Sequence, residues 1–162
     1  MAPRFTATLA LVLAVGAGCG TPSGDAAGDP PPPAECPASV VPATARPSQT
    51  RDGALVTGRP SRALLCRYAA TGATRPLTGT DEVDAGRVSA VVAALNALPA
   101  WEPASGEDGG CLLGEQAWYE IVVGYPDRPP AVLDVSPDCG VVSGGGAVRR
   151  MPSLTALLGL WA

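Results

Sequence analysis

With 162 residues, the chain has room for one folded domain once its ends are set aside. Its formal net charge is -4 at pH 7, and this acidic balance disfavours binding to the nucleic-acid backbone. Its basic residues are all arginines. The sequence contains no histidine and no lysine, which excludes Ser–His and Cys–His nucleophile pairs, Ser–Lys dyads, Schiff bases and histidine-bound zinc.

The first eighteen residues have the pattern of a secretory leader. Arg4 supplies the positive charge at its start, residues 5–15 form an apolar run, and residues 16–18 are small, as before a cleavage point. The apolar run is shorter than the about 20 residues that a membrane-spanning helix needs. We therefore expect residues 1–18 to be a signal peptide.

The segment Val15-Gly16-Ala17-Gly18-Cys19 resembles the lipobox of bacterial lipoproteins, in which a cysteine after small residues is acylated once the leader is removed. That motif usually has leucine where this chain has Gly16. The resemblance implies a lipid on Cys19 and a domain held at the outer face of the cytoplasmic membrane. Two alternatives stay open: cleavage after Ala17, which would release a secreted protein, and an uncleaved leader.

Residues 20–35 are rich in glycine, proline, serine, alanine and aspartate, and they show no apolar periodicity. Such a segment cannot bury enough surface to fold. We expect residues 19–35 to be a lipidated cysteine followed by a disordered tether, which would hold the domain up to about 50 Å from its anchor at about 3.1 Å per residue. A single domain is then expected over residues 36–162.

In the first part of this domain, residues 62–70 alternate in the manner of a strand, whereas residues 38–51 allow one short strand at most. The alternation places Cys66 and Tyr68 on one side, facing the core, and the arginines in water. A helix is predicted next, capped by Thr80 or Asp81 and ended by Pro99. Its buried face consists of valines and leucines at helical spacing: Val88, Val91, Val92, Leu95 and Leu98.

An antiparallel hairpin is predicted after residue 116. Two runs of β-branched and aromatic residues, 117–124 and 131–135, flank a turn-rich segment, and residues 140–143 form a third short strand beside them. Glu120 and Asp134 are expected on the solvent side. Residues 101–110 form a polar contact loop, and residues 143–146 a flexible one.

The chain ends in a short amphipathic helix that begins at Pro152 and docks on the sheet. Its apolar face contains Leu154, Leu157, Leu158 and Trp161. The sequence thus predicts an α+β fold: a small antiparallel sheet packed against one main helix, with a short C-terminal helix and two disulfides.

The disulfides follow from counting cysteines. Lipidation of Cys19 would leave four: Cys36, Cys66, Cys111 and Cys139. Four cysteines allow three pairings, and sequence alone cannot choose among them. We favour Cys36 with Cys66 and Cys111 with Cys139, because each pair closes the shorter loop.

Without histidine and lysine, and with the cysteines assigned to the lipid and the disulfides, carboxylate groups are the remaining candidates for catalysis. A glycosidase pair would have to come from Glu102, Glu107, Asp108, Glu115, Glu120, Asp127 and Asp134. Such a pair needs a spacing of about 5 to 10 Å in a cleft lined by sugar-stacking rings, which a domain with so few aromatic residues seldom offers. The acidic residues 81, 82 and 84 lack the regular spacing of a calcium loop. We therefore expect no enzyme activity, no metal and no cofactor.

Two resemblances to known families accompany these patterns. The first is to a group of uncharacterised actinobacterial secreted or lipidated proteins, and it implies a location and a disulfide frame without an activity. It is carried by the leader, the spacer and five short stretches: residues 65–68, Cys111, residues 124–129, residues 133–135 and residues 139–140.

The second resemblance is to the subtilisin-inhibitor-like family of secreted bacterial protease inhibitors. Residues 95–98, followed by Cys111, a strand pair and Cys139, are similar to the order in that family. It implies an exposed reactive loop after the third cysteine, formed here by Leu112, Leu113 and Gly114, with Leu113 presented to the protease. The family has proline at the position of Leu112.

The preferred functional hypothesis is a non-catalytic cell-envelope lipoprotein. Its domain would bind an unidentified envelope protein or ligand outside the cytoplasm, with the membrane contacted through the N-terminal lipid. The alternative is a serine protease inhibitor of the subtilisin-inhibitor-like kind.

Overall fold

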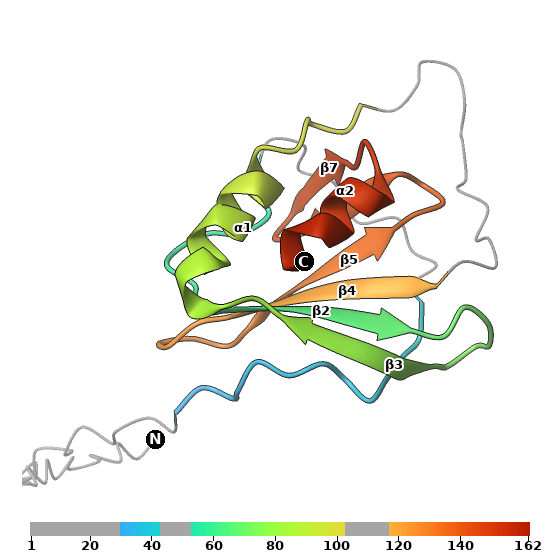
Figure 1. Cartoon of the computed structure of the whole chain (residues 1–162), viewed down its shortest axis with the longest axis horizontal. Coiled ribbons are helices and arrows are strands. Elements are labelled where there is room, and N and C mark those ends of the chain that lie inside the picture. The colour runs from blue at the N-terminus through green and yellow to red at the C-terminus, as the bar shows by residue number, and fades with distance from the viewer. Residues whose placement is uncertain (1–29, 43–52, 103–116) are drawn as a thin grey trace, which may run out of the picture.

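The computed structural model describes residues 30–42, 53–102 and 117–162, which form an antiparallel sheet of seven strands with two short helices (Figure 1). The strand order in the sheet is β1-β3-β2-β4-β5-β6-β7. The α+β class expected from the sequence is therefore confirmed. Within these described ranges, no helix is long and apolar enough to cross a membrane.

The strands are β1 (Ser39–Val40), β2 (Arg62–Tyr68), β3 (Arg75–Glu82), β4 (Trp118–Gly124), β5 (Ala131–Ser136), β6 (Val141–Gly144) and β7 (Ala147–Arg150). The helices are α1 (Val88–Asn96) and α2 (Leu154–Leu158). A 3₁₀ turn, η1 (Ala85–Arg87), precedes α1, and another, η2 (Gly159–Trp161), follows α2. A strand over residues 62–70 and a hairpin of the two following runs were predicted. Both are confirmed, with β2 ending at Tyr68 and with β4 and β5 forming the hairpin.

The predicted start of the main helix was wrong. Thr80 and Asp81 belong to β3, and α1 begins only at Val88. The acidic residues find arginine partners on the neighbouring strand instead of a helix N-terminus: Asp81 pairs with Arg67, and Glu82 binds Arg62 through two hydrogen bonds of 2.7 and 2.9 Å. A cross-strand ion pair and a helix dipole attract the same residue types, so the sequence pattern did not distinguish them.

The predicted flexible loop over residues 143–146 was also wrong. Ser143 and Gly144 complete β6, and Gly145 and Gly146 form the two-residue turn into β7, with φ angles of 57° and 82°. A hairpin turn with two positive φ angles favours glycine at both positions, because other residues have a Cβ that clashes there. The glycine run is therefore a tight turn.

Both helices lie on one face of the sheet, where the larger core forms (Figure 1). The predicted apolar faces are buried at their centres: Val88, Val91 and Leu95 from α1, and Leu157 from α2. They pack with strand residues such as Leu65, Ile121 and Leu133, which are at most 2% exposed. Ser153 caps α2 by accepting a hydrogen bond from the backbone of Ala156.

The opposite face is covered by residues 30–42, which we call the N-terminal strap. Ala34 and Cys36 of the strap pack on a second, smaller core formed by residues of β2 and β4: Leu64, Cys66, Tyr68, Trp118 and Val122. Gly124 permits this contact, since a Cβ there would lie 2.7 Å from the Cβ of Ala34. The sheet is thus covered on both faces at β2 and β4.

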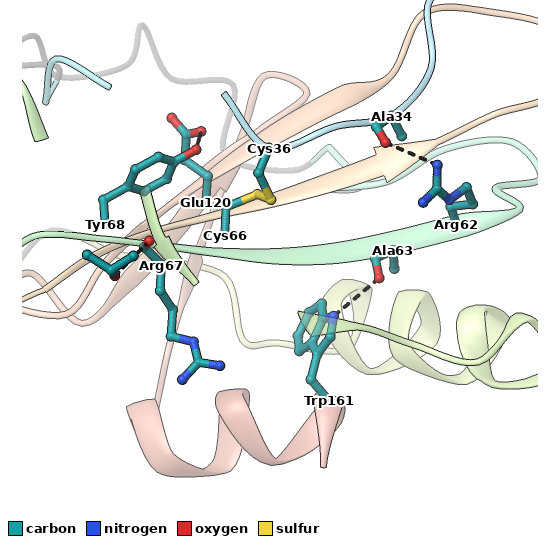
Figure 2. Close-up of a disulfide and its surroundings, with 10 residues drawn as sticks. Ala34, Cys36, Arg62, Ala63, Cys66, Arg67, Tyr68, Glu120 and Trp161 are labelled. Atoms are coloured by element: carbon teal, nitrogen blue, oxygen red, sulfur yellow. Dashed lines mark hydrogen bonds between the residues drawn. A yellow bond between two sulfur atoms is a disulfide. The ribbon is translucent and has the colours of Figure 1, made fainter. Parts of the chain in front are cut away.

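A disulfide joins the strap to the sheet. Cys36 is bonded to Cys66 of β2, with the two Cα atoms 5.6 Å apart (Figure 2), so the favoured pairing of these cysteines is confirmed. Only this one of the two predicted disulfides is seen. Cys111 lies outside the described residues, and its bridge to Cys139 stays a prediction.

Candidate binding site

Most of the functional residues predicted from the sequence lie outside the described part of the chain. These are Cys19, Cys111 and the inhibitor loop Leu112, Leu113 and Gly114, together with residues 103–110 of the contact loop. Cys36 and Cys66 are described and bridged. The site is therefore sought in the polar groups and hollows of the described residues.

The first polar group is buried under the strap. The hydroxyl of Tyr68 donates a hydrogen bond to Oε2 of Glu120 over 3.1 Å (Figure 2). Glu120 is only 8% exposed, so its predicted position on the solvent side was wrong. The alternating sequence of β4 indicated one buried and one solvent-exposed face. In the structure both faces are buried, because the strap and the second core lie against the face on which Glu120 is located.

Burial controls the electrostatics of this group. It raises the pKa of Glu120, and the charge of Asp134 raises it further, whereas the hydrogen bond from Tyr68 opposes the change. Asp134 lies directly opposite Glu120 in the β4–β5 register, and burial raises its pKa as well. Burial and the charge of Glu120 together raise the pKa of Tyr68. Both carboxyl groups therefore retain their protons to a higher pH than in water.

A raised pKa on paired carboxyl groups is also found in acid–base catalysts, but such groups need access to a substrate. Neither Glu120 nor Asp134 lines either of the two open hollows described below. Arg75, 7% exposed, lies 5.7 Å above the ring of Trp118 in the same region. We interpret these residues as a buried network that fixes the strap side of the sheet.

The second polar group lines an open hollow of about 240 Å³ on the helix-covered face, which we call the helix-face groove. Its lining consists of Leu65 and Arg67 from β2, Asp81 from β3, and Leu158, Trp161 and Ala162 from the C-terminal segment. Figure 2 shows Arg67 and Trp161 on the side of β2 opposite to the Cys36–Cys66 disulfide. The groove combines one aromatic ring, two leucines and one ion pair.

The side chains of the groove are held by specific contacts. The indole Nε1 of Trp161 donates to the backbone oxygen of Ala63 over 3.3 Å. The guanidinium of Arg67 pairs with the carboxylate of Asp81 on the neighbouring strand. These contacts orient the groove before any ligand binds.

The C-terminal wall of the groove is braced from the helix side. The guanidinium of Arg87 donates to the backbone oxygen of Ala162 over 2.8 Å and to that of Leu160 over 3.1 Å. One side chain thereby fixes two carbonyl groups at the end of a helical segment, where intrahelical donors are missing.

A second hollow of about 260 Å³ lies beside the β4–β5 turn. Arg128 stacks 3.7 Å above the ring of Tyr125 and donates a hydrogen bond to the backbone oxygen of Thr57. Gly58 has a φ of 79°, and a Cβ there would lie 2.6 Å from Nη2 of Arg128. This arginine fastens the loop over residues 53–58 to the turn.

Sequence reasoning missed the groove because its residues come from three distant parts of the chain. In the described ranges, no cluster of three or more acidic or cysteine side chains is placed to hold a metal ion. Comparison of the chain with protein-family models, with curated proteins and with solved structures finds no match. Function is therefore argued from the residues themselves.

Proposed function

We propose that the protein is a non-catalytic cell-envelope lipoprotein, and that its α+β domain binds a ligand or partner outside the cytoplasm. The lipid is assigned to Cys19 on the strength of residues 15–19. The binding role is assigned to the helix-covered side of the domain, where an oriented indole and an oriented ion pair line an open hollow. Pockets with few, well-placed polar groups among apolar ones are typical of ligand sites.

The observation that carries this proposal is the Cys36–Cys66 disulfide. Disulfides persist in oxidising compartments, which supports a position outside the cytoplasm. The bridge also fastens the end of the expected tether to the interior strand β2, on the face opposite to the groove. The tether therefore joins the domain on the strap side of β2 and does not occupy the helix-covered face.

A sedimentation assay tests the proposal. The protein would be produced from residue 19 onward with a Cys19→Ala change and mixed with purified cell wall and membranes of the organism that makes it. We expect saturable co-sedimentation with one of these fractions at micromolar protein. Absence of binding to both fractions, with a folded protein verified by circular dichroism, would contradict the proposal.

A further inference from the structure

We infer that the helix-face groove binds a neutral saccharide, and more narrowly one sugar ring at a time. This inference rests on the proposed function and deepens it by naming the class of ligand. It follows from the charge of the groove, from the ring that lines it and from its size.

The charge of the groove favours a neutral ligand. Arg67 and Asp81 form an ion pair with side chains that are 45% and 41% exposed, so this pair offers donors and acceptors side by side and carries no net charge of its own. An anionic ligand would meet Asp81, and a cationic ligand would meet Arg67. A purely apolar ligand would remove water from both groups without replacing its hydrogen bonds, which is costly.

Neighbouring hydroxyl groups match this ion pair. One hydroxyl oxygen accepts from the guanidinium N–H of Arg67, and the next hydroxyl donates to a carboxylate oxygen of Asp81. Hydrogen bonds to charged groups are the stronger ones in proteins. A polyol therefore restores on both partners the hydrogen bonds that water made.

The indole restricts the ligand further. Trp161 is half-buried and lines the groove together with Leu65 and Leu158. Sugar rings present C–H groups on their faces and hydroxyls around their rims, so an apolar floor beside a polar pair complements both parts. Tryptophan combines a large apolar surface with a fixed orientation, here set by its bond to Ala63.

The size of the groove sets the extent of the ligand. Its volume of about 240 Å³ lies below the range of about 300–1,000 Å³ that is usual for drug-sized ligands, which suits one ring of a monosaccharide or of a glycan chain. The bracing by Arg87 and the contact with Ala63 reduce the ordering cost on binding. For so small a contact we expect a dissociation constant on the order of 1 mM.

Nuclear magnetic resonance on the Cys19→Ala protein tests the inference. The indole N–H resonance of Trp161, assigned from a Trp161→Phe variant, would be followed during titration with glucose, galactose, mannose and N-acetylglucosamine, with glucuronate as the anionic comparison. We expect at least one neutral sugar to shift this resonance saturably. We also expect Asp81→Asn and Arg67→Gln each to weaken binding by about tenfold, because each removes a charged partner.

The chain provides a matched control. Arg62 and Glu82 form a second exposed β2–β3 ion pair, and neither residue lines the groove. Arg62→Gln should leave the sugar affinity unchanged. Equal losses in Arg62→Gln and Arg67→Gln would contradict a groove-specific site, as would tighter binding of glucuronate than of every neutral sugar, or the absence of any saturable shift.

Failure of this inference is distinguishable from failure of the proposed function. If the protein sediments with envelope material, and Asp81→Asn and free sugar leave that binding unchanged, the saccharide inference is wrong and the binding role stands. If it binds neither sugars nor envelope material, both are wrong.

Discussion

Removal of the Cys36–Cys66 disulfide should strongly destabilise the domain. The bridge joins residues separated by 30 positions, and it closes a loop that includes the second half of the strap, the connecting segment and most of β2. The loop-closure relation gives about 3.6 kcal/mol for a loop of this length. Cys66 is fully buried, so replacement of both cysteines by alanine adds a packing loss of about 1 kcal/mol.

Urea unfolding of the Cys36→Ala/Cys66→Ala protein, followed by tryptophan fluorescence, measures this loss. The double variant is preferable to a reducing agent because it leaves the predicted Cys111–Cys139 bridge untouched. We expect the free energy of unfolding to fall by about 4–5 kcal/mol, mainly through a lower midpoint. Amide exchange supplies a local readout: the N–H of Leu77, which donates to Ala38 of the strap over 2.9 Å, should lose its protection before amides in β4.

A loss below about 1 kcal/mol in the double variant would refute this reasoning, since the loop-closure contribution would then be absent. Retained protection of Leu77 would lead to the same conclusion by another route. It would mean that the strap remains seated on the sheet without its covalent bond.

Three further predictions concern a carboxyl group, a turn and the predicted inhibitor loop. Because burial raises the pKa of Glu120, the folded state holds this proton to a higher pH than the unfolded chain, and stability should fall as the pH rises above the ordinary glutamate value. Glu120→Gln, whose side-chain oxygen still accepts from Tyr68, should remove the contribution of Glu120 to this fall. The variant should therefore gain stability relative to the original protein as the pH rises from 4 to 8. Thermal unfolding across this pH range checks the prediction, and a difference that stays constant with pH would contradict it. Gly145→Ala should lower the free energy of unfolding by about 1–2 kcal/mol, because the φ angle is 57° and the added Cβ would lie 2.9 Å from the backbone oxygen of Leu55. Gly86→Ala is the control, since the added Cβ would have no atom within 4 Å, and it should change the urea midpoint little. If the inhibitor hypothesis is right, the protein will inhibit a subtilisin-like protease stoichiometrically and Leu113→Gly will abolish inhibition; no inhibition at micromolar protein would remove that hypothesis.

The parts of the fold that were predictable have local causes. Alternation in residues 62–70 predicted β2, and the two runs that flank residues 125–130 predicted β4 and β5, because apolar, β-branched and aromatic residues recur there at strand spacing. The apolar face of α1 also required only neighbouring sequence, and the pairing of Cys36 with Cys66 required only the spacing of the cysteines along the chain.

The errors have non-local causes. Asp81 and Glu82 precede an apolar periodic segment and resemble the first turn of a helix, but Arg67 and Arg62 compete for them across the β2–β3 pair. Glu120 alternates with apolar residues and appears solvent-facing, yet the strap covers the face on which it lies. Neither competitor is visible within a short window of sequence.

The candidate site was not predictable for the same reason. Arg67 and Asp81 become neighbours only once residues 75–82 are known to be a strand, and Trp161 reaches them only when α2 docks on the sheet. The sequence did indicate that Trp161 belongs to the apolar face of a docked C-terminal helix. It gave no indication that part of this ring lines a groove.

The most direct test of the proposed function is the intact mass of the protein isolated from its own cells, measured with and without reduction after thiol alkylation. We predict a chain that begins at Cys19, bears acyl chains on that residue, and gains alkylation at four further cysteines only after reduction. An unmodified leader together with four cysteines that alkylate without reduction would contradict the anchor, the compartment and the binding role derived from them.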